Sequence, residues 1–294
     1  MVGDQGRTGS GAAELTVELE LTAGLRAGYE AAAAAWADGP GPLYTQLARV
    51  LVAAAPVPLA GAVVLDLGAG TGAAGWAALA AGARQVVAAD LSLGMLRHAR
   101  DRGAPAPASS AAWDPVVADA VALPFRDHRF DLVVAAFCLN HLDSLAAGLA
   151  EVRRVGAAIA ASAFAPDWAH PAKGAVDKVL RSFGYQPPAW YACLSPGSRA
   201  GDPAALAEHA AAAGFTDVQV RTADVRTALV TPAELASWRL GLAQVAPFLR
   251  SLAPADRAAV RRAAEHAVAE AIGRGNGTDA AASLVVSIVI LTAS

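Results

Sequence analysis

The sequence predicts an α/β protein with a mostly parallel seven-stranded sheet and helices on both faces. Two observations carry this prediction. Short apolar runs alternate with longer helical patterns from about residue 60 onward, which is typical of strands joined by helical crossovers. The first of these runs, VVLDLGAGTG at residues 63–72, ends in a glycine-rich turn that opens an alanine-rich helix, and the amides at such a helix start attract anions.

Helices are expected before, beside and within the sheet region. Residues 14–55 favour two helices with a break at residues 39–42, where glycine and proline alternate, and residues 1–13 are expected to be disordered. We therefore predict N-terminal helices at 14–56 that cover the site, a sheet core at 57–230 and 280–294, and an inserted helical lid at 231–279. Within the core, residues 103–114 are expected to form a loop and residues 203–213 a helix.

The strands follow from short apolar runs bounded by turn residues. They are expected at residues 63–67, 85–89, 115–119, 130–136, 157–164, 217–222 and 284–291. The last of these is too short to cross a membrane as a helix, which needs about 20 apolar residues.

Composition favours a soluble cytoplasmic enzyme. The net charge is −3, and no basic cluster interleaved with aromatic residues appears, so neither nucleic acid nor a membrane is an expected partner. Cys138 and Cys193 are the two cysteines, too few for a disulfide framework or a cysteine metal cluster, and no metal site is predicted. Residues 1–13 lack the apolar core of a signal peptide. The apolar helices suggest a homodimer.

The residue before the glycine turn decides which cofactor the turn suits. Gly70, Gly72 and Gly75 match the GxGxxG fingerprint of dinucleotide sites, so the turn by itself is ambiguous. Asp66 would sit badly beside a pyrophosphate, but it suits a cofactor that carries an ammonium and a sulfonium. S-adenosylmethionine fits that description, with S-adenosylhomocysteine as the product of its use.

Three further motifs follow the glycine turn in the expected order. QVVAAD ends a strand at Asp90, VVADAVALPF ends the next strand at Asp119, and FDLVVAAFCLNHL supplies a fourth strand and its exit. With these motifs in register, the sequence resembles the class I S-adenosylmethionine-dependent methyltransferases, and it is similar to their ubiquinone and menaquinone biosynthesis group. The resemblance covers about residues 60–165 and implies that the sheet core is a Rossmann-like methyltransferase domain.

The motifs and the resemblance together imply a cofactor-binding set. Asp90 can accept both ribose hydroxyls, and the residues that follow Asp119 bracket the adenine in the family. Aromatic residues near the N-terminus close over the methionine end in relatives of the ubiquinone type. The predicted set is Tyr29, Trp36, Tyr44, Asp66, Gly68, Ala69, Gly70, Gly72, Asp90, Leu91, Met95, Asp119, Ala120, Val121 and Phe137.

Aromatic residues near the expected lids predict an acceptor pocket for a flat, apolar or aromatic natural product. Its expected lining is Phe164, Trp168, Trp190, Tyr191, Trp238 and Phe248. Methyl transfer depends mainly on placement, but a hydroxyl or amine acceptor must also lose a proton. His141, after the fourth strand, and His170, after the fifth, are the candidate catalytic bases.

Three functions remain open from the sequence. The first is methyl transfer to oxygen, nitrogen or carbon of a small molecule. The second is a cyclisation or rearrangement on the same scaffold, in which S-adenosylmethionine is retained without being consumed. The third is a binding protein that senses the cofactor. Fold alone does not choose among them.

Overall fold

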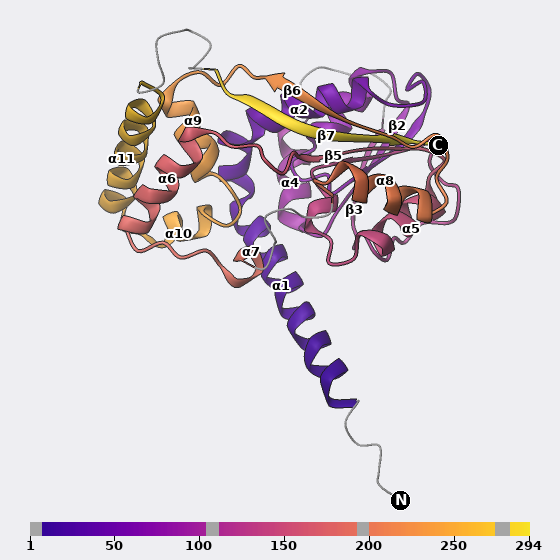
Figure 1. The fold of residues 1–294 in the computed structure, drawn as a ribbon, viewed down its shortest axis with the longest axis horizontal. Helices are drawn as coiled ribbons and strands as arrows, with labels where there is room; N and C mark the ends of the chain where they lie inside the picture. The colour runs from indigo at the N-terminus through magenta and orange to yellow at the C-terminus, as the bar shows by residue number, and fades with distance from the viewer. Residues whose placement is uncertain (1–7, 104–111, 193–199, 274–282) are drawn as a thin grey trace, which may run out of the picture.

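The computed structural model describes residues 8–103, 112–192, 200–273 and 283–294, with side chains described from residue 19 onward. Seven strands form one sheet in the order β3-β2-β1-β4-β5-β7-β6 (Figure 1). Strands β1 to β5 run parallel to one another, whereas β7 pairs antiparallel with both β5 and β6. This confirms the predicted mostly parallel seven-stranded sheet. The strands are β1 Val63–Leu67, β2 Gln85–Asp90, β3 Ala112–Val117, β4 Leu132–Ala136, β5 Ile159–Phe164, β6 Gln219–Arg226 and β7 Val285–Ala293.

Helices cover both faces of the sheet, because successive residues of the central strands point to opposite sides. Val64 and Val134 belong to a core with the helices on one face, and Leu65 and Val133 belong to a second core with the helices on the other. The first face carries α2 Gly41–Ala53 and α3 Ala73–Ala80, and α4 Leu93–Arg102 lies over β2 and β3. The second face carries α5 Leu145–Val155 and α8 Pro203–Ala212.

The strand order reverses beside β1, since β2 lies on one side of it and β4 on the other. In open α/β sheets a crevice forms at such a point, outside the carboxyl ends of the strands, because the connecting helices leave toward opposite faces. The glycine turn after β1, the acid at the end of β2 and the segment that follows β4 therefore come together at one edge of the sheet.

A second group of helices packs at one end of the sheet (Figure 1). It comprises α6 Pro171–Ser182, α7 Ala189–Ala192, α9 Pro232–Leu240, α10 Ala246–Ser251 and α11 Pro254–Gly273. Helices α6, α9 and α11 pack on one another. The three helices α9 to α11 fall where the sequence predicted helices.

The N-terminal helix α1, Thr8–Asp38, crosses the body and extends beyond it (Figure 1). It contacts α4, α7 and α10, and it meets α2 at the predicted break. The helix begins at Thr8, whereas the sequence predicted disorder as far as residue 13, because the glycine and serine residues of that segment are poor helix formers.

The third strand begins and ends earlier than predicted. It runs from Ala112 to Val117 and pairs with β2 along its whole length, so the expected loop at 103–114 is wrong for its last three residues. Residues 104–111 lie outside the described part of the chain. Because β3 is an edge strand with mostly exposed residues, its apolar pattern is weak, and Pro115 is tolerated there.

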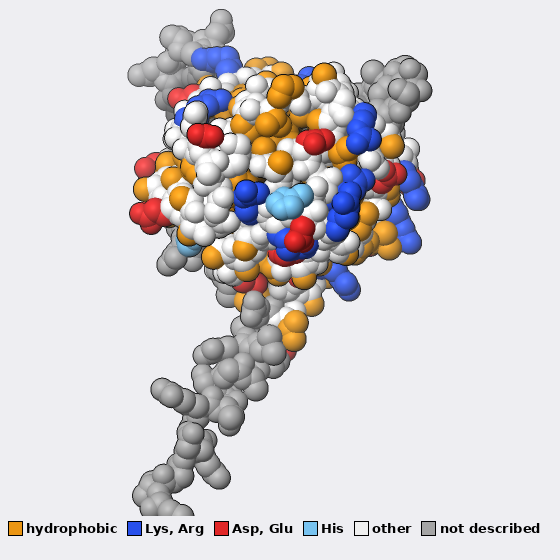
Figure 2. Space-filling model, turned by 90° about the vertical axis from the view of Figure 1, so that its right-hand side faces the viewer, with side chains coloured by type: hydrophobic (Ala, Val, Ile, Leu, Met, Phe, Trp, Pro, Cys, Tyr) orange, Lys and Arg blue, Asp and Glu red, His pale blue; other side chains and the backbone are white. Residues whose placement is uncertain are grey.

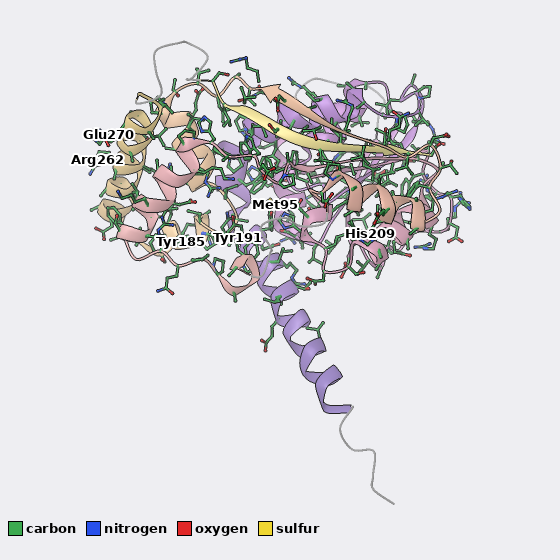
Figure 3. All side chains as sticks on the ribbon, viewed as in Figure 1. Met95, Tyr185, Tyr191, His209, Arg262 and Glu270 are labelled. Carbon is green, nitrogen blue, oxygen red and sulfur yellow. The ribbon has the colours of Figure 1, made fainter. Side chains whose placement is uncertain are left out.

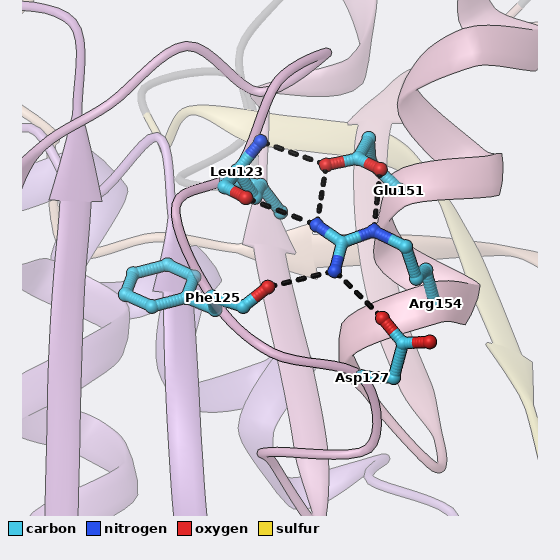
Figure 4. Close-up of polar contacts among 5 residues, drawn as sticks. All are labelled: Leu123, Phe125, Asp127, Glu151 and Arg154. Carbon is cyan, nitrogen blue, oxygen red and sulfur yellow. Dashed lines mark hydrogen bonds and ion pairs between the residues drawn. The ribbon is translucent and has the colours of Figure 1, made fainter.

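An arginine fixes the loop that leads from the site into β4. The guanidinium of Arg154 on α5 pairs with Glu151 and Asp127, and it donates hydrogen bonds to the backbone carbonyls of Leu123 and Phe125 (Figure 4). Glu151 in turn accepts a hydrogen bond from the Leu123 amide at 2.7 Å. Helix α5 then passes almost directly into β5.

Charge on the surface is mixed. On the face that carries the C-terminus, basic and acidic side chains are interspersed with apolar ones (Figure 2). This distribution accords with the small net charge of −3.

Candidate active site

A cavity of about 470 Å³ lies at the carboxyl ends of β1, β2, β4 and β5, with α1 along one side. This volume falls within the range of about 300–1,000 Å³ that is usual for small-molecule sites. Most of the predicted cofactor residues line it. They are Tyr29, Trp36, Tyr44, Asp66, Gly68, Ala69, Gly70, Asp90, Leu91, Met95, Asp119, Ala120, Val121 and Phe137.

The turn between β1 and α3 depends on glycine for two different reasons. Gly68, Gly70 and Gly72 all have positive φ, at 67°, 53° and 86°. A Cβ at Gly68 would lie 2.6 Å from the Cys138 sulfur, whereas a Cβ at Gly70 would meet no atom within 4 Å. The backbone at Gly70 therefore borders open cavity space. Gly72 caps α3 and does not line the cavity, which differs from the prediction.

Asp90 is held by two backbone amides at the end of β2. Gly70 donates to its Oδ2 and Ser92 donates to its Oδ1, each at 2.7 Å. Burial raises the pKa of Asp90, while these two hydrogen bonds favour the ionised carboxylate. The carboxylate orientation is thus fixed by the chain before any ligand arrives.

Asp66 is a second buried carboxylate in the same cavity. It is 1% exposed, and its Oδ2 accepts a hydrogen bond from the Gly75 amide at 2.7 Å. The pKa of Asp66 is raised to about 7, mainly by burial and to a smaller extent by the negative charge of Asp90, while the hydrogen bond from the Gly75 amide acts in the opposite direction. Two carboxylates that repel each other in a buried site favour a cationic ligand, so this end of the cavity fits the ammonium and sulfonium of S-adenosylmethionine.

The expected adenine side of the cavity is mainly apolar. Met95 on α4 is fully buried and lies near the middle of the molecule (Figure 3). Asp119 accepts a hydrogen bond from the Val121 amide at 3.1 Å, which shapes the turn after β3. Val121 is 39% exposed, so this wall of the cavity reaches solvent.

Aromatic rings form a continuous wall of the cavity. Ring centroids are 5.4 Å apart for Tyr29 and Trp36, 4.9 Å for Trp36 and Tyr44, and 5.2 Å for Tyr44 and Phe137. Phe164 continues the wall, 4.6 Å from Phe137. These distances are typical of favourable aromatic contacts, and the wall suits a flat apolar ligand.

Phe137 adopts a backbone conformation that bulky residues rarely have. Its φ is 56°, directly after β4, and its amide donates to the Ser162 carbonyl at 3.0 Å. A left-handed conformation in a large non-glycine residue costs free energy, and such residues cluster at functional sites. Here the conformation accompanies the placement of the ring in the cavity wall.

The structure places the predicted acceptor residues in two groups. Phe164 and Trp190 line the cavity, whereas Trp168, Tyr191, Trp238 and Phe248 do not. Trp168 stacks behind Phe164, and Trp238 packs against Trp168 in the core. Helix α9, which carries Trp238, packs against α6 and α11, and helix α10, which carries Phe248, packs against α1.

Two of these aromatic residues lie near Tyr185 at the helical end of the molecule. Phe248 packs against Tyr185, with ring centroids 5.3 Å apart. Tyr191 is 36% exposed on α7, and Figure 3 shows it on the same side as Tyr185.

Trp190 reaches the cavity because two glycines let it approach α1. A Cβ at Gly24 would lie 3.0 Å from the indole, and a Cβ at Gly28 would lie 2.9 Å from it. The indole also packs against Tyr29, with ring centroids 6.2 Å apart. The spacing of these glycines, four residues apart on one helix, is the sequence signal for this contact, and the sequence analysis missed it.

His141 lies in the cavity and contacts α1. It ends the short 3-10 helix Leu139–His141 after β4, and its Nε2 is 3.1 Å from the Tyr29 hydroxyl. Burial lowers the pKa of His141 to about 4, so its imidazole is neutral near pH 7. Burial also raises the pKa of Tyr29, which keeps its phenol protonated.

The other candidate base lies elsewhere. His170 caps α6, where its Nδ1 accepts a hydrogen bond from the Ala172 amide at 3.2 Å, and it does not line the cavity. Ser144 caps α5, the next α-helix after β4, so the Asn140 side chain is not used as its cap. Asn140 lines the cavity, and its Oδ1 is buried without a hydrogen-bond partner in the described structure.

Within the described ranges, no group of three or more histidine, cysteine or acidic residues is arranged to hold a metal ion. The same search of the described residues finds no helix that is long and apolar enough to cross a membrane.

Known proteins resemble both the sequence and the fold. A family model described as a methyltransferase domain matches residues 64–157. The demethylmenaquinone methyltransferase of Clavibacter sepedonicus is 46% identical over 110 residues, which are 37% of this chain and 43% of that protein. The enzyme of the same name from Thermobifida fusca (strain YX) is 34% identical over 186 residues, which are 59% of this chain and 77% of that protein.

Two solved structures share the fold. A protein of Anabaena variabilis, described as a methyltransferase from an antibiotic biosynthesis pathway, has a TM-score of 0.57 at 16% identity and covers 84% of this chain and 96% of its own. The [4+2]-cyclase SpnF has a TM-score of 0.52 at 21% identity and covers 85% of this chain and 80% of its own.

The mostly parallel sheet and the matched methyltransferase domain define a protein that uses S-adenosylmethionine. The chain belongs to the class I S-adenosylmethionine-dependent methyltransferases, and within them it is similar to the menaquinone group. S-adenosylmethionine is the cofactor of this family. The matched segment spans less than half of the Clavibacter sepedonicus relative, and the family name of a relative does not by itself assign an acceptor.

Proposed function

We propose that this protein transfers the methyl group of S-adenosylmethionine to oxygen, nitrogen or carbon of a small aromatic or apolar acceptor of the natural-product type. One observation carries the proposal. A single cavity is lined by two buried carboxylates, a wall of aromatic rings and a buried imidazole. A cationic cofactor and a flat acceptor would then meet within the same enclosed space.

The chain's own residues divide the work of binding. Asp90 is oriented to accept the ribose hydroxyls, and Asp66 faces the positively charged end of the cofactor. The turn after Asp119 and the side chains of Leu91 and Met95 bracket the adenine, while Tyr29, Trp36 and Tyr44 close the methionine end. The bound cofactor supplies an activated methyl group. Holding an acceptor at near-attack distance can contribute about 7–11 kcal/mol to the rate.

His141 is the proposed base for a hydroxyl or amine acceptor. The Tyr29 hydroxyl, 3.1 Å from Nε2, can take the acceptor proton and pass its own proton to the imidazole. Methyl transfer removes one positive charge from the cavity, and protonation of His141 restores one near Asp66 and Asp90. This balance offsets the burial that otherwise disfavours the imidazolium. His170 caps a helix away from the cavity, so the proposal gives it no part in the chemistry.

An acceptor screen tests the proposal. The purified protein is incubated with S-adenosylmethionine and a panel of phenols, quinols, amines and apolar carbon acids, and S-adenosylhomocysteine and methylated products are followed by mass spectrometry. We expect equal amounts of both products with at least one flat apolar acceptor. Absence of any methylated product across the panel, despite tight cofactor binding, would contradict methyl transfer.

Cyclisation is the alternative, and the fold likeness to the [4+2]-cyclase SpnF together with the aromatic wall favours it as the second candidate. A reactive chain folded against the wall could cyclise without losing a methyl equivalent. Turnover of a substrate without formation of S-adenosylhomocysteine would identify this activity. A cofactor-sensing protein would bind S-adenosylmethionine but turn over no substrate. The aromatic wall of the cavity argues against this function, because a sensor needs no pocket for an acceptor.

We also propose that the protein acts in the cytoplasm as a homodimer without nucleic acid or membrane partners. Its two cysteines and small net charge support this location, and its apolar helices support self-association. Sedimentation equilibrium gives the oligomeric state directly, and a monomer at micromolar concentration would contradict the dimer.

A further inference from the structure

Helix α1 is attached to the cofactor side of the cavity by one side chain. The Glu30 Oε2 accepts hydrogen bonds from the Ser92 hydroxyl and from the Gly94 amide, each at 2.8 Å. Both donors belong to the start of α4, where unpaired amides and the helix dipole favour a carboxylate. The Gly94 amide lowers the pKa of Glu30, so the side chain is ionised at neutral pH.

The same short segment holds the proposed ribose carboxylate. The Ser92 amide donates to Asp90 Oδ1, and the Gly70 amide donates to Asp90 Oδ2. A chain of hydrogen bonds therefore runs from Glu30 on α1 through Ser92 and Asp90 to the glycine turn. A ligand that orders Asp90 and Ser92 is therefore expected to order the Ser92 hydroxyl and the Gly94 amide, which donate hydrogen bonds to Glu30.

Tyr29, the neighbour of Glu30 in the sequence, faces the cavity itself. Tyr29 lines the cavity, and its hydroxyl lies 3.1 Å from Nε2 of His141. On its other side the Tyr29 ring contacts Trp190. Consecutive residues of one helix thus contact the start of α4 through Glu30 and the proposed base His141 through Tyr29.

We propose that Glu30 is a positioning residue that latches α1 over the cofactor end of the cavity and thereby places Tyr29 against His141. Binding of the cofactor and closure of α1 support each other, so the cofactor binds first and completes the acceptor site. The effect of Glu30 on cofactor binding rests on the proposed function. The contact of α1 with α4 does not, because it is present in the protein without ligand.

The matched test replaces Glu30→Gln and uses Asp38→Asn as its control. Glutamine keeps the size of the side chain but loses the charge. Asp38 makes another polar contact between α1 and α4, an ion pair with Arg102 at 3.3 Å between two exposed side chains. Exposed pairs of this kind contribute little, so Asp38→Asn is expected to behave as the unmodified protein does.

Three readouts are compared in these proteins. They are the dissociation rate of S-adenosylhomocysteine, the hydrogen exchange of backbone amides in residues 20–36, and the imidazole NMR signals of His141. For Glu30→Gln we expect dissociation to become about tenfold faster, in line with the loss of a charged helix cap. We also expect exchange in residues 20–36 to rise, and the His141 signals to shift in the direction seen in Tyr29→Phe.

Each readout can overturn the proposal. An unchanged dissociation rate refutes the latch, and unchanged His141 signals refute the coupling to Tyr29. If the unmodified protein binds neither S-adenosylmethionine nor S-adenosylhomocysteine, the proposed function fails. The exchange of residues 20–36 without ligand still tests the latch, since it must rise in Glu30→Gln.

A second variant guards against misfolding of Glu30→Gln. A Cβ at Gly94 would lie 2.9 Å from the Glu30 carboxyl carbon, so Gly94→Ala disturbs the same contact from the α4 side. We expect it to reproduce the faster dissociation and the raised exchange. Normal dissociation and exchange in Gly94→Ala would contradict the latch.

Discussion

At the scale of single residues, the cavity is defined by carboxylates that the protein buries at a cost. Asp66 and Asp90 both have raised pKa values because they are removed from water, and neither forms an ion pair with a basic side chain in the described structure. Such groups are costly unless a ligand compensates them. Binding of a cation offsets that cost, and this is why these two residues carry the argument for the cofactor.

Asp90→Ala tests the ribose contact. We expect cofactor binding to weaken by about 1–3 kcal/mol, since two hydroxyls lose a charged acceptor. Calorimetric titration with S-adenosylhomocysteine measures the effect, and a thermal unfolding scan checks that the fold persists. Asp101→Ala, at an exposed position on α4, is the control. An equal dissociation constant in Asp90→Ala and in the unmodified protein would contradict the assignment.

The raised pKa of Asp66 predicts that the free energy of unfolding depends on pH. Its pKa in the folded protein is about 7, above the value of 3.8 expected when exposed, so the folded state binds more protons between these values. The contribution of Asp66 to the free energy of unfolding is therefore largest below about pH 4 and is lost as the pH rises toward 7. Denaturant unfolding of the protein without ligand should show a steeper fall over this range than unfolding of Asp66→Asn.

Cofactor affinity should change in the opposite sense, because the cation favours the ionised carboxylate. Between pH 5.5 and 7.5 we expect the affinity for S-adenosylmethionine to rise more in the unmodified protein than in Asp66→Asn. Equal pH profiles for the two proteins would show that Asp66 does not face the cationic part of the cofactor.

Gly70→Val separates binding from folding. The backbone at Gly70 has a φ of 53°. A Cβ there would meet no atom within 4 Å and would project beside the cavity. We expect a loss of stability of about 1–2 kcal/mol from the strained backbone. Cofactor binding should be lost altogether, because the side chain fills ligand space. Near-normal affinity by calorimetry would exclude the turn from the site.

At the scale of elements, the site is built from residues at the ends of strands, and the loops between elements fix the positions of these strand ends. The loop from Leu123 to Asp127 leads into β4 and is fixed by the guanidinium of Arg154, which makes charged hydrogen bonds on several sides (Figure 4). The loop begins just after Asp119 and Val121 of the cavity wall. A change that loosens this loop is therefore expected to disturb the geometry of the site as well.

Arg154→Met should lower the free energy of unfolding by about 1–3 kcal/mol, because two carbonyls and two carboxylates lose a shared donor. Urea denaturation measures the loss. Arg126→Met, at an exposed position in the same loop, should have little effect. Equal destabilisation by the two variants would show that the network of Arg154 adds nothing specific.

Sequence patterns were most informative where elements are buried. The strands β1, β4 and β5 are almost wholly buried, and their apolar runs gave their positions closely. Edge strand β3 is mostly exposed, so its start was misplaced. The helices α9 and α11 have apolar faces whose existence was predictable, but their packing partner, α6, depends on tertiary contacts that the pattern does not encode.

At the scale of the whole molecule, one side of the cavity comes from the sheet and the other from α1. Residues that follow strand ends were predictable as site residues, because parallel strands bring their carboxyl ends to one edge. The roles of Glu30, Gly24 and Gly28 were not predictable, because each depends on a partner that is distant in the sequence. Glu30 contacts Ser92, and the two glycines contact Trp190. Tyr29 was predicted from the family resemblance, but its contact with His141 came from the structure.

The closest test of the central claim is a calorimetric titration of the protein, freed of any carried cofactor, with S-adenosylmethionine, S-adenosylhomocysteine and NAD. The buried carboxylates at the end of β1 and β2 predict micromolar binding of S-adenosylmethionine and S-adenosylhomocysteine and no binding of NAD. Binding of NAD, or of none of the three, would contradict the assignment of the cavity as a methyltransferase site.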